Sequence, residues 1–230
     1  MKNIKLIGYG VAVVAAASGM AAVNLVVNPG FELGDTGFTS LYTSTPYASQ
    51  SMGLPDTYTV GASSQFVHSQ WLPGAVNVAA HSGQNYMLNN GSESDSTVWR
   101  SGPIAGVVSG SQYFFEAWVV SLFPSNPPQL KFQISADAAF TTPIDLGLSL
   151  TPTPPGTWTA TSTIWNATFN SPVWLRLQNA QFAFSGNDFG VDDINFSLES
   201  RIPEAQTLAA AAGLFGVAGL TILRRRNKKA

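Results

Sequence analysis

Apolar and polar residues alternate with a period of two in three separate stretches of the chain. Residues 130–135 read Leu-Lys-Phe-Gln-Ile-Ser, residues 173–178 read Val-Trp-Leu-Arg-Leu-Gln, and residues 194–198 read Ile-Asn-Phe-Ser-Leu. Because successive side chains of a β-strand point to opposite faces, this pattern predicts strands with one buried side and one solvent-facing side. Residues 113–120 are almost continuously apolar and follow the turn-forming pair Gly110-Ser111, so we expect a central strand there.

Composition supports a fold made of strands. The middle of the chain is rich in Ser, Thr, Asn, Gly, Pro, Phe and Trp and poor in Lys, Glu and Leu, which disfavours long helices. The chain has no cysteine, which excludes thiolate zinc sites and thiol catalysis. About 180 residues suffice to bury a core without disulfides. We therefore predict an all-β fold: a two-sheet antiparallel β-sandwich of jelly-roll type over residues 23–200.

The two ends of the chain differ from this middle part. Lys2 and Lys5 precede an apolar run that ends in small residues, a pattern typical of a secretory signal peptide, here residues 1–22. The alternatives are a buried helix or an uncleaved anchor. Residues 207–223 are uncharged and precede a basic tail, which predicts a transmembrane helix with a cytoplasmic tail. The alternative there is a buried helix with a solvated basic cap.

Charge narrows the range of partners. Residues 23–206 contain four basic residues and all 13 acidic residues, a formal charge of −9 against −2 for the whole chain. Nucleic-acid binding needs a cationic surface, so this balance excludes nucleic acid as the expected partner. An acidic exported domain is instead suited to solubility and to binding divalent cations.

The C-terminal segment 201–230 resembles a PEP-CTERM sorting signal. The resemblance rests on the Pro203-Glu204 pair, the apolar stretch 207–223 and the cluster Arg224-Arg225-Arg226. Ala205 stands where such signals usually have a second proline. The resemblance implies transient anchoring in the inner membrane, processing by an exosortase-type membrane protease, and delivery to the bacterial cell surface or extracellular matrix.

Four stretches, in order, resemble galactose-binding-like jelly rolls, which include many carbohydrate-binding modules. They are an opening strand at 24–32, an inner strand at 80–88, a strand-turn-strand unit at 101–118 and a closing strand at 186–194. The resemblance implies a structural calcium ion beside the first and last strands, with Glu32 and Asp193 as ligands. Carboxylates are ligands that calcium prefers. The alternative is that both residues are turn-forming acids; Asp188 and Asp192 are less favoured as ligands.

A carbohydrate site needs flat aromatic rings beside hydrogen-bonding side chains. If residues 173, 175 and 177 face the core, then Trp174, Arg176 and Gln178 face outward. We therefore expect a sugar platform at these three residues, with 131, 133 and 135 as its neighbours. The alternatives are that Trp174 packs under a loop, or that the platform lies at Trp71 or Trp99.

Nothing in the sequence predicts an enzyme. His68 and His81 lie in no catalytic motif, and Glu116 has no recognisable partner for the two-carboxylate chemistry of glycosidases. We expect a non-catalytic surface protein that binds or organises envelope or extracellular polysaccharide. The alternatives are a structural matrix protein without a sugar site and a small secreted glycan-active enzyme.

Overall fold

The computed structural model describes residues 22–72, 76–91, 95–183 and 185–199. The predicted signal peptide, and the predicted sorting signal with Pro203, Glu204 and Arg224–Arg226, lie outside the described residues. Among the described residues, no helix has the length and apolar character needed to cross a membrane.

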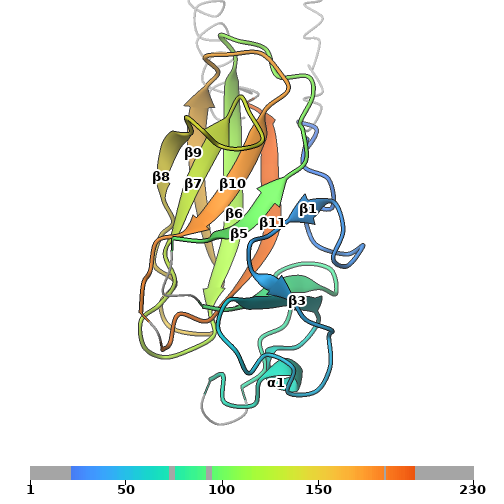
Figure 1. Cartoon of the computed structure of the whole chain (residues 1–230), viewed down its shortest axis with the longest axis vertical. Coiled ribbons are helices and arrows are strands. Elements are labelled where there is room, and N and C mark those ends of the chain that lie inside the picture. Colours follow the sequence, from blue (N-terminus) through green and yellow to red (C-terminus); the bar gives the residue numbers. More distant parts are fainter. Residues whose placement is uncertain (1–21, 73–75, 92–94, 184, 200–230) are drawn as a thin grey trace, which may run out of the picture. The chain divides into compact units, whose positions relative to one another are not determined.

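Two β-sheets lie face to face, which confirms the predicted all-β sandwich (Figure 1). The five-stranded sheet has the order β1 (Phe38–Thr39), β5 (Thr97–Ser101), β10 (Trp174–Asn179), β7 (Leu130–Ser135) and β8 (Ile144–Leu148). The six-stranded sheet has the order β2 (Thr43–Ser44), β3 (Thr57–Gly61), β4 (Tyr86–Asn90), β11 (Phe189–Leu198), β6 (Gln112–Ser121) and β9 (Thr159–Asn166). Neighbouring strands are antiparallel except β2 and β3, which are parallel.

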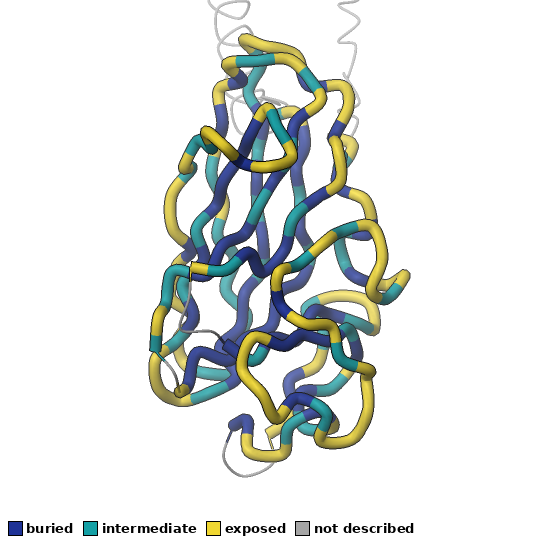
Figure 2. Tube along the Cα trace, viewed as in Figure 1, coloured by how far each residue is buried: buried dark blue, intermediate teal, exposed yellow. Residues whose placement is uncertain are grey.

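The core lies between the sheets and is made by one side of each alternating strand. Leu175 and Leu177 of β10 face inward with no exposed surface, as do Phe115 of β6 and Phe196 of β11. The predicted strand at 113–120 is the inner part of β6, which is flanked by β11 and β9. Figure 2 shows the resulting buried strands within exposed loops.

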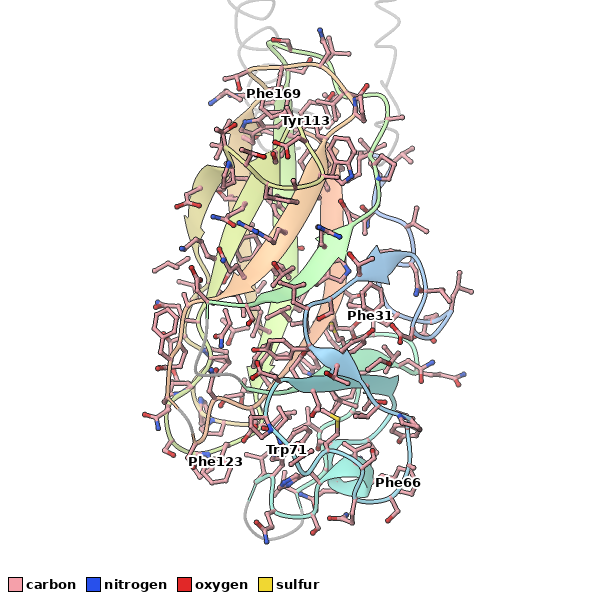
Figure 3. All side chains as sticks on the ribbon, viewed as in Figure 1. Phe31, Phe66, Trp71, Tyr113, Phe123 and Phe169 are labelled. Atoms are coloured by element: carbon pink, nitrogen blue, oxygen red, sulfur yellow. The ribbon has the colours of Figure 1, made fainter. Side chains whose placement is uncertain are left out.

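A second apolar cluster covers part of the outer face of the six-stranded sheet. It joins residues from the sheet, such as Tyr86 and Val120, to residues from the connection between β3 and β4. That connection includes the one-turn helix α1 (Ser64–Val67), and Trp71 lies beside it (Figure 3). Residues 22–199 therefore form one compact unit with its own core, as expected of an independently folding domain.

The predicted opening strand is wrong in its detail. Residues 24–32 form no regular strand, although they run beside the second half of β11. The Leu25 amide donates to the Phe196 carbonyl at 2.8 Å, and the Ile194 amide donates to the Pro29 carbonyl at 2.9 Å. The Asn24 side chain replaces a backbone partner: its amide donates to the Ile194 carbonyl and its oxygen accepts from the Phe196 amide.

Candidate functional site

The three residues of the predicted sugar platform, Trp174, Arg176 and Gln178, lie on β10 of the five-stranded sheet. Residues Trp174 and Arg176 of β10 are half-buried, whereas Leu175 and Leu177 between and beyond them are fully buried. This is the arrangement that the period-two pattern predicted, because the pleat turns alternate side chains away from the core.

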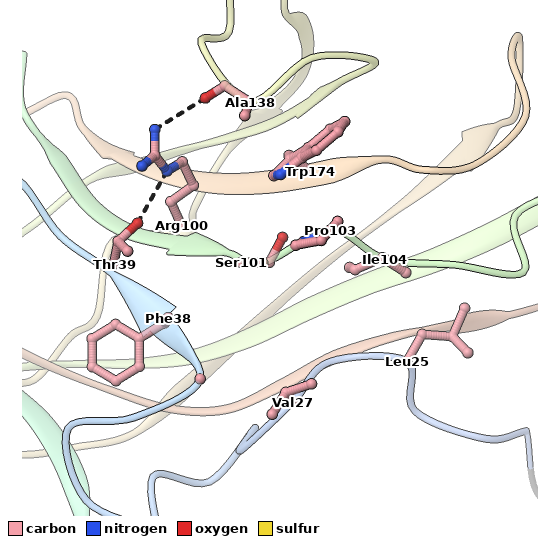
Figure 4. A pocket seen from close by; sticks show the side chains of 12 residues that line it. Leu25, Val27, Phe38, Thr39, Arg100, Ser101, Pro103, Ile104, Ala138 and Trp174 are labelled. Atoms are coloured by element: carbon pink, nitrogen blue, oxygen red, sulfur yellow. Dashed lines mark hydrogen bonds between the residues drawn. The ribbon is translucent and has the colours of Figure 1, made fainter.

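Trp174 lies in a groove with a volume of about 490 Å³, here named the Trp174 groove. Its walls come from the N-terminal segment, β1, the end of β5 with the loop that follows it, and the loop between β7 and β8 (Figure 4). The lining residues are Leu25, Val27, Gly37, Phe38, Thr39, Arg100, Ser101, Gly102, Pro103, Ile104, Ala138 and Trp174.

Arg100 is the charged residue of this groove. It is half-buried on β5 and faces Arg176 across the β5–β10 pair. Its Nε donates to Thr39 Oγ1 and its Nη1 donates to the Ala138 carbonyl, each at 3.0 Å. Two neutral acceptors from different segments therefore hold the guanidinium in place beside the groove (Figure 4).

The other two predicted platform residues do not line the groove. Arg176 donates from Nε to Gln133 Oε1 at 2.7 Å, and its guanidinium carbon lies 4.4 Å from the centre of the Phe140 ring. Burial lowers the pKa of Arg176, and Arg100 lowers it further, while Asp95 and Asp145 raise it. Gln178 is 8% exposed and donates to the Asp95 carbonyl at 3.0 Å. The structure thus brings Trp174 together with Arg100 and engages Arg176 and Gln178 with the protein itself.

The alternative prediction, which placed the sugar platform at Trp71 or Trp99, is wrong. Trp71 and Trp99 are each 1% exposed and pack in the two apolar clusters. Trp99 pairs with Leu177 across β5 and β10, so it faces the core. A sugar outside the domain cannot stack on either ring.

Sequence reasoning missed Arg100. Arg100 lies on β5, whose five residues read Thr-Val-Trp-Arg-Ser. Where β5 pairs with β10, the register shifts between Leu177 and Gln178 of β10, so buried and outward positions do not alternate simply along β5. The position of Arg100 opposite Arg176 depends on the pairing of β5 with β10, which are far apart in the chain. The one available signal was that the segment has very few cations.

The predicted calcium ligands both contact the loop 81–85. Glu32 Oε1 accepts from the backbone amides of Gln84 at 2.7 Å and Asn85 at 2.9 Å. One Asp193 oxygen, Oδ1, accepts from Ser82 Oγ at 2.7 Å, and the other, Oδ2, contacts His81 Nδ1 at 2.6 Å. Calcium takes about six to eight oxygen ligands, so it would have to replace these donors. Among the described residues, no group of three or more His, Asp or Glu side chains has a metal-binding arrangement.

A β-bulge in β11 places two acidic residues under this loop. The register with β6 shifts between Asp192 and Asn195, and Asp193 adopts a positive φ of 46°. Asp192 is fully buried and accepts from the amides of His81 at 2.9 Å and Ser82 at 3.3 Å, and from Asp193 at 2.8 Å. Burial, together with the Asp193 charge, raises the pKa of Asp192 to about 7, although the three amides lower it.

Both histidines pack against tryptophan. The His81 ring stacks on Trp118 with centroids 3.6 Å apart, and the His68 ring stacks on Trp71 at 5.0 Å. Burial lowers the pKa of His68. Glu116, on the outward side of β6, has its pKa raised by burial and by Asp193. His81 therefore holds the loop 81–85 against the six-stranded sheet.

Comparison with known proteins gives similarities of architecture only. The chain matches no protein-family profile and no curated protein sequence. A family 16 carbohydrate-binding module matches 75% of this chain and 99% of its own, with 18% identity and a TM-score of 0.46. A family 61 module solved with β-1,4-galactotriose matches 77% of this chain and 100% of its own, with 12% identity and a TM-score of 0.46.

A longer chain is also similar: the Clostridium thermocellum xylanase 10B fragment that joins a family 22 module to its GH10 module, solved with xylohexaose. It matches 77% of this chain and 29% of its own, with 17% identity and a TM-score of 0.48. At such identities and TM-scores, these similarities assign no ligand to this chain.

Proposed function

We propose that residues 22–199 form a non-catalytic domain that binds polysaccharide in the Trp174 groove. The observation that carries the proposal is a half-buried indole and an oriented guanidinium lining one groove of about 490 Å³. A pyranose ring has an apolar face and a polar rim, so a binding site combines an aromatic ring with hydrogen-bond donors. The groove supplies both.

The outer face of the five-stranded sheet is less covered near Trp174 than the outer face of the six-stranded sheet, which also supports the proposal. The outer face of the six-stranded sheet is partly covered by the β3–β4 connection and its apolar cluster. On the five-stranded sheet, the loop between β7 and β8 covers Arg176 through Phe140, while Trp174 stays half-buried at the rim of a groove. An indole left partly in water forgoes some of the stabilisation that full burial provides, which points to an external contact.

The proposal extends to the place where the domain works. The N-terminal pattern and the PEP-CTERM-like segment 201–230 support export, transient anchoring in the inner membrane and processing by an exosortase-type protease. The mature domain then acts at the cell surface or in the extracellular matrix. There it binds or organises polysaccharide.

The test replaces the half-buried Trp174 and, as a control, an exposed aromatic residue elsewhere on the domain. A glycan array and affinity electrophoresis on residues 22–199 identify the polysaccharide bound by the wild type. Trp174→Ala is expected to weaken that binding about tenfold, because a stacked ring contributes about 1 kcal/mol or more. Phe66→Ala, on the distant helix α1, removes a 43% exposed ring and is expected to leave binding unchanged (Figure 3).

Urea unfolding separates lost binding from lost folding. A half-buried Trp174 is expected to cost less on truncation than the roughly 3–5 kcal/mol typical of a core tryptophan. Equal binding by Trp174→Ala and the wild type would exclude the groove as the site. Binding of no glycan at all would favour a structural matrix protein.

A further inference from the structure

The basic residues of the domain gather on one face. Residues 22–199 contain three Lys or Arg and twelve Asp or Glu, a formal charge of −9. The three cations are Arg100 on β5, Arg176 on β10 and Lys131 on β7, three strands that are adjacent in the five-stranded sheet. All three are half-buried and alternate with core residues, so they share the outer face.

Arg100 and Arg176 oppose each other directly. They are register partners in the antiparallel β5–β10 pair, where side chains on the same face lie about 5 Å apart at Cβ. Like charges in such positions are destabilising unless an anion compensates them. Among the described residues, the only ion pair joins His81 and Asp193 on the other sheet. Neither arginine therefore has a carboxylate within ion-pair distance among the described residues.

Neutral groups orient these cations instead of neutralising them. Arg100 is held by a hydroxyl and a carbonyl, and Arg176 by an amide oxygen and the face of Phe140. Asp95 and Asp145 lie near enough to raise the pKa of Arg176 and so offset part of its charge. Asp145 accepts from the Gln133 side chain, Asp137 accepts from the backbone of its own loop, and among the described residues neither forms an ion pair with Arg100.

Among the described residues, the guanidinium of Arg100 uses only some of its donors. Arginine has five N–H groups, and two of those of Arg100 are used in the hydrogen bonds to Thr39 and Ala138. Arg100 and Trp174 both line the Trp174 groove (Figure 4). A guanidinium pairs with carboxylate more strongly than with neutral oxygen, because the hydrogen bonds are charge-assisted.

We infer that the Trp174 groove binds an anionic polysaccharide, with a sugar ring stacked on Trp174 and its acidic substituent paired with Arg100. This inference rests on the proposed function and names its ligand class. Arg176 and Lys131 lie on the same face, so the cations of the described residues are concentrated there. An otherwise acidic domain repels anionic chains, so this face is where such a chain can approach.

The experiment measures binding of residues 22–199 to four probes by titration calorimetry. The probes are polygalacturonate as the carboxylated chain, a sulfated galactan, and xylan and β-1,4-galactan as neutral chains. The wild type is expected to bind an anionic chain at least tenfold more tightly than the neutral ones. Added salt is expected to weaken this binding, since exposed charges are screened. Preference between the first two probes shows whether the substituent is a carboxylate or a sulfate ester.

Two variants that each remove one positive charge separate a local contact from a general charge effect. Arg100→Gln is expected to weaken binding of the anionic chain about tenfold, because a charged hydrogen bond contributes about 1.5 kcal/mol or more. Lys131→Gln, on the same face but outside the groove lining, is expected to change it less than about twofold.

The outcomes separate this inference from the proposed function. If neutral chains bind as well as anionic ones and Arg100→Gln matches Lys131→Gln, the inference is overturned. If Trp174→Ala still weakens binding in that case, the sugar site itself stands. If Trp174→Ala binds every probe as the wild type does, the proposed groove fails as well.

Discussion

The buried carboxyl of Asp192 makes the stability of the domain depend on pH in a defined direction. Burial and the charge of Asp193 raise its pKa to about 7 in the folded state, against an ordinary value of 3.8. Between about pH 4 and pH 7, the Asp192 carboxyl is therefore protonated to a greater extent in the folded chain than in the unfolded chain. The free energy of unfolding is expected to fall as the pH rises through this window.

The size of the effect follows from the difference in pKa. One pKa unit corresponds to about 1.4 kcal/mol, so Asp192 alone contributes about 3 kcal/mol between pH 5 and pH 8. Asp188 acts in the same direction, because burial raises its pKa to about 6. Asp137 acts in the opposite direction: its desolvation is outweighed by hydrogen bonds from its own loop, and its pKa is lowered.

Urea unfolding of residues 22–199 at about pH 5 and about pH 8 measures this difference. Asp192→Asn removes the titrating group and is expected to remove most of the pH dependence, whatever it does to stability at a single pH. Asp56→Asn removes an exposed carboxylate from a turn and is expected to keep the wild-type dependence. A wild type that is more stable at pH 8, or an Asp192→Asn variant with an unchanged pH dependence, would refute the reasoning.

Three further predictions concern packing, metal and sorting. Gly91→Ala is expected to lower the free energy of unfolding by about 3 kcal/mol or more, because the added Cβ would lie 1.7 Å from the Asn187 carbonyl oxygen. Gly53→Ala places its Cβ in open space and is expected to leave the free energy of unfolding, measured in the same urea experiment, nearly unchanged. Millimolar calcium is expected to raise the melting temperature, and Glu32→Ala or Asp193→Ala to abolish the rise; equal melting temperatures in calcium and EDTA would exclude the metal site. Mass spectrometry of surface protein is expected to find a chain without the basic tail, and an intact chain in the culture medium would contradict processing.

The period-two pattern predicted the sandwich because it is a local property of each strand. The alternation at residues 173–178 correctly placed Trp174 and Arg176 on the outer side of β10. It could not show that Phe140 covers Arg176 while Trp174 stays beside a groove, because that depends on the path of the loop between β7 and β8.

The groove itself depends on contacts between distant segments. Its walls include the N-terminal segment near Leu25, the loop after β5 and Ala138, which no local pattern connects. The opening strand was wrongly predicted for a related reason: the side chain of Asn24 supplies hydrogen bonds that a backbone ladder would otherwise make. Glu32 and Asp193 do meet one loop, but through donors that the sequence does not reveal.

The run of residues 24–29 along β11 sets how the domain responds to mechanical force. Leu25 lies beside Phe196 and Pro29 beside Ile194, so the two segments are antiparallel and both ends of the domain leave side by side. A force that pulls those two ends apart would load the hydrogen bonds between residues 24–29 and β11 one at a time, so the two segments would separate at a low force. A force applied through one end alone would leave the hydrogen bonds between residues 24–29 and β11 intact. Joining the neighbouring ends by a short linker and opening a surface loop elsewhere is likewise expected to give a folded circular permutant.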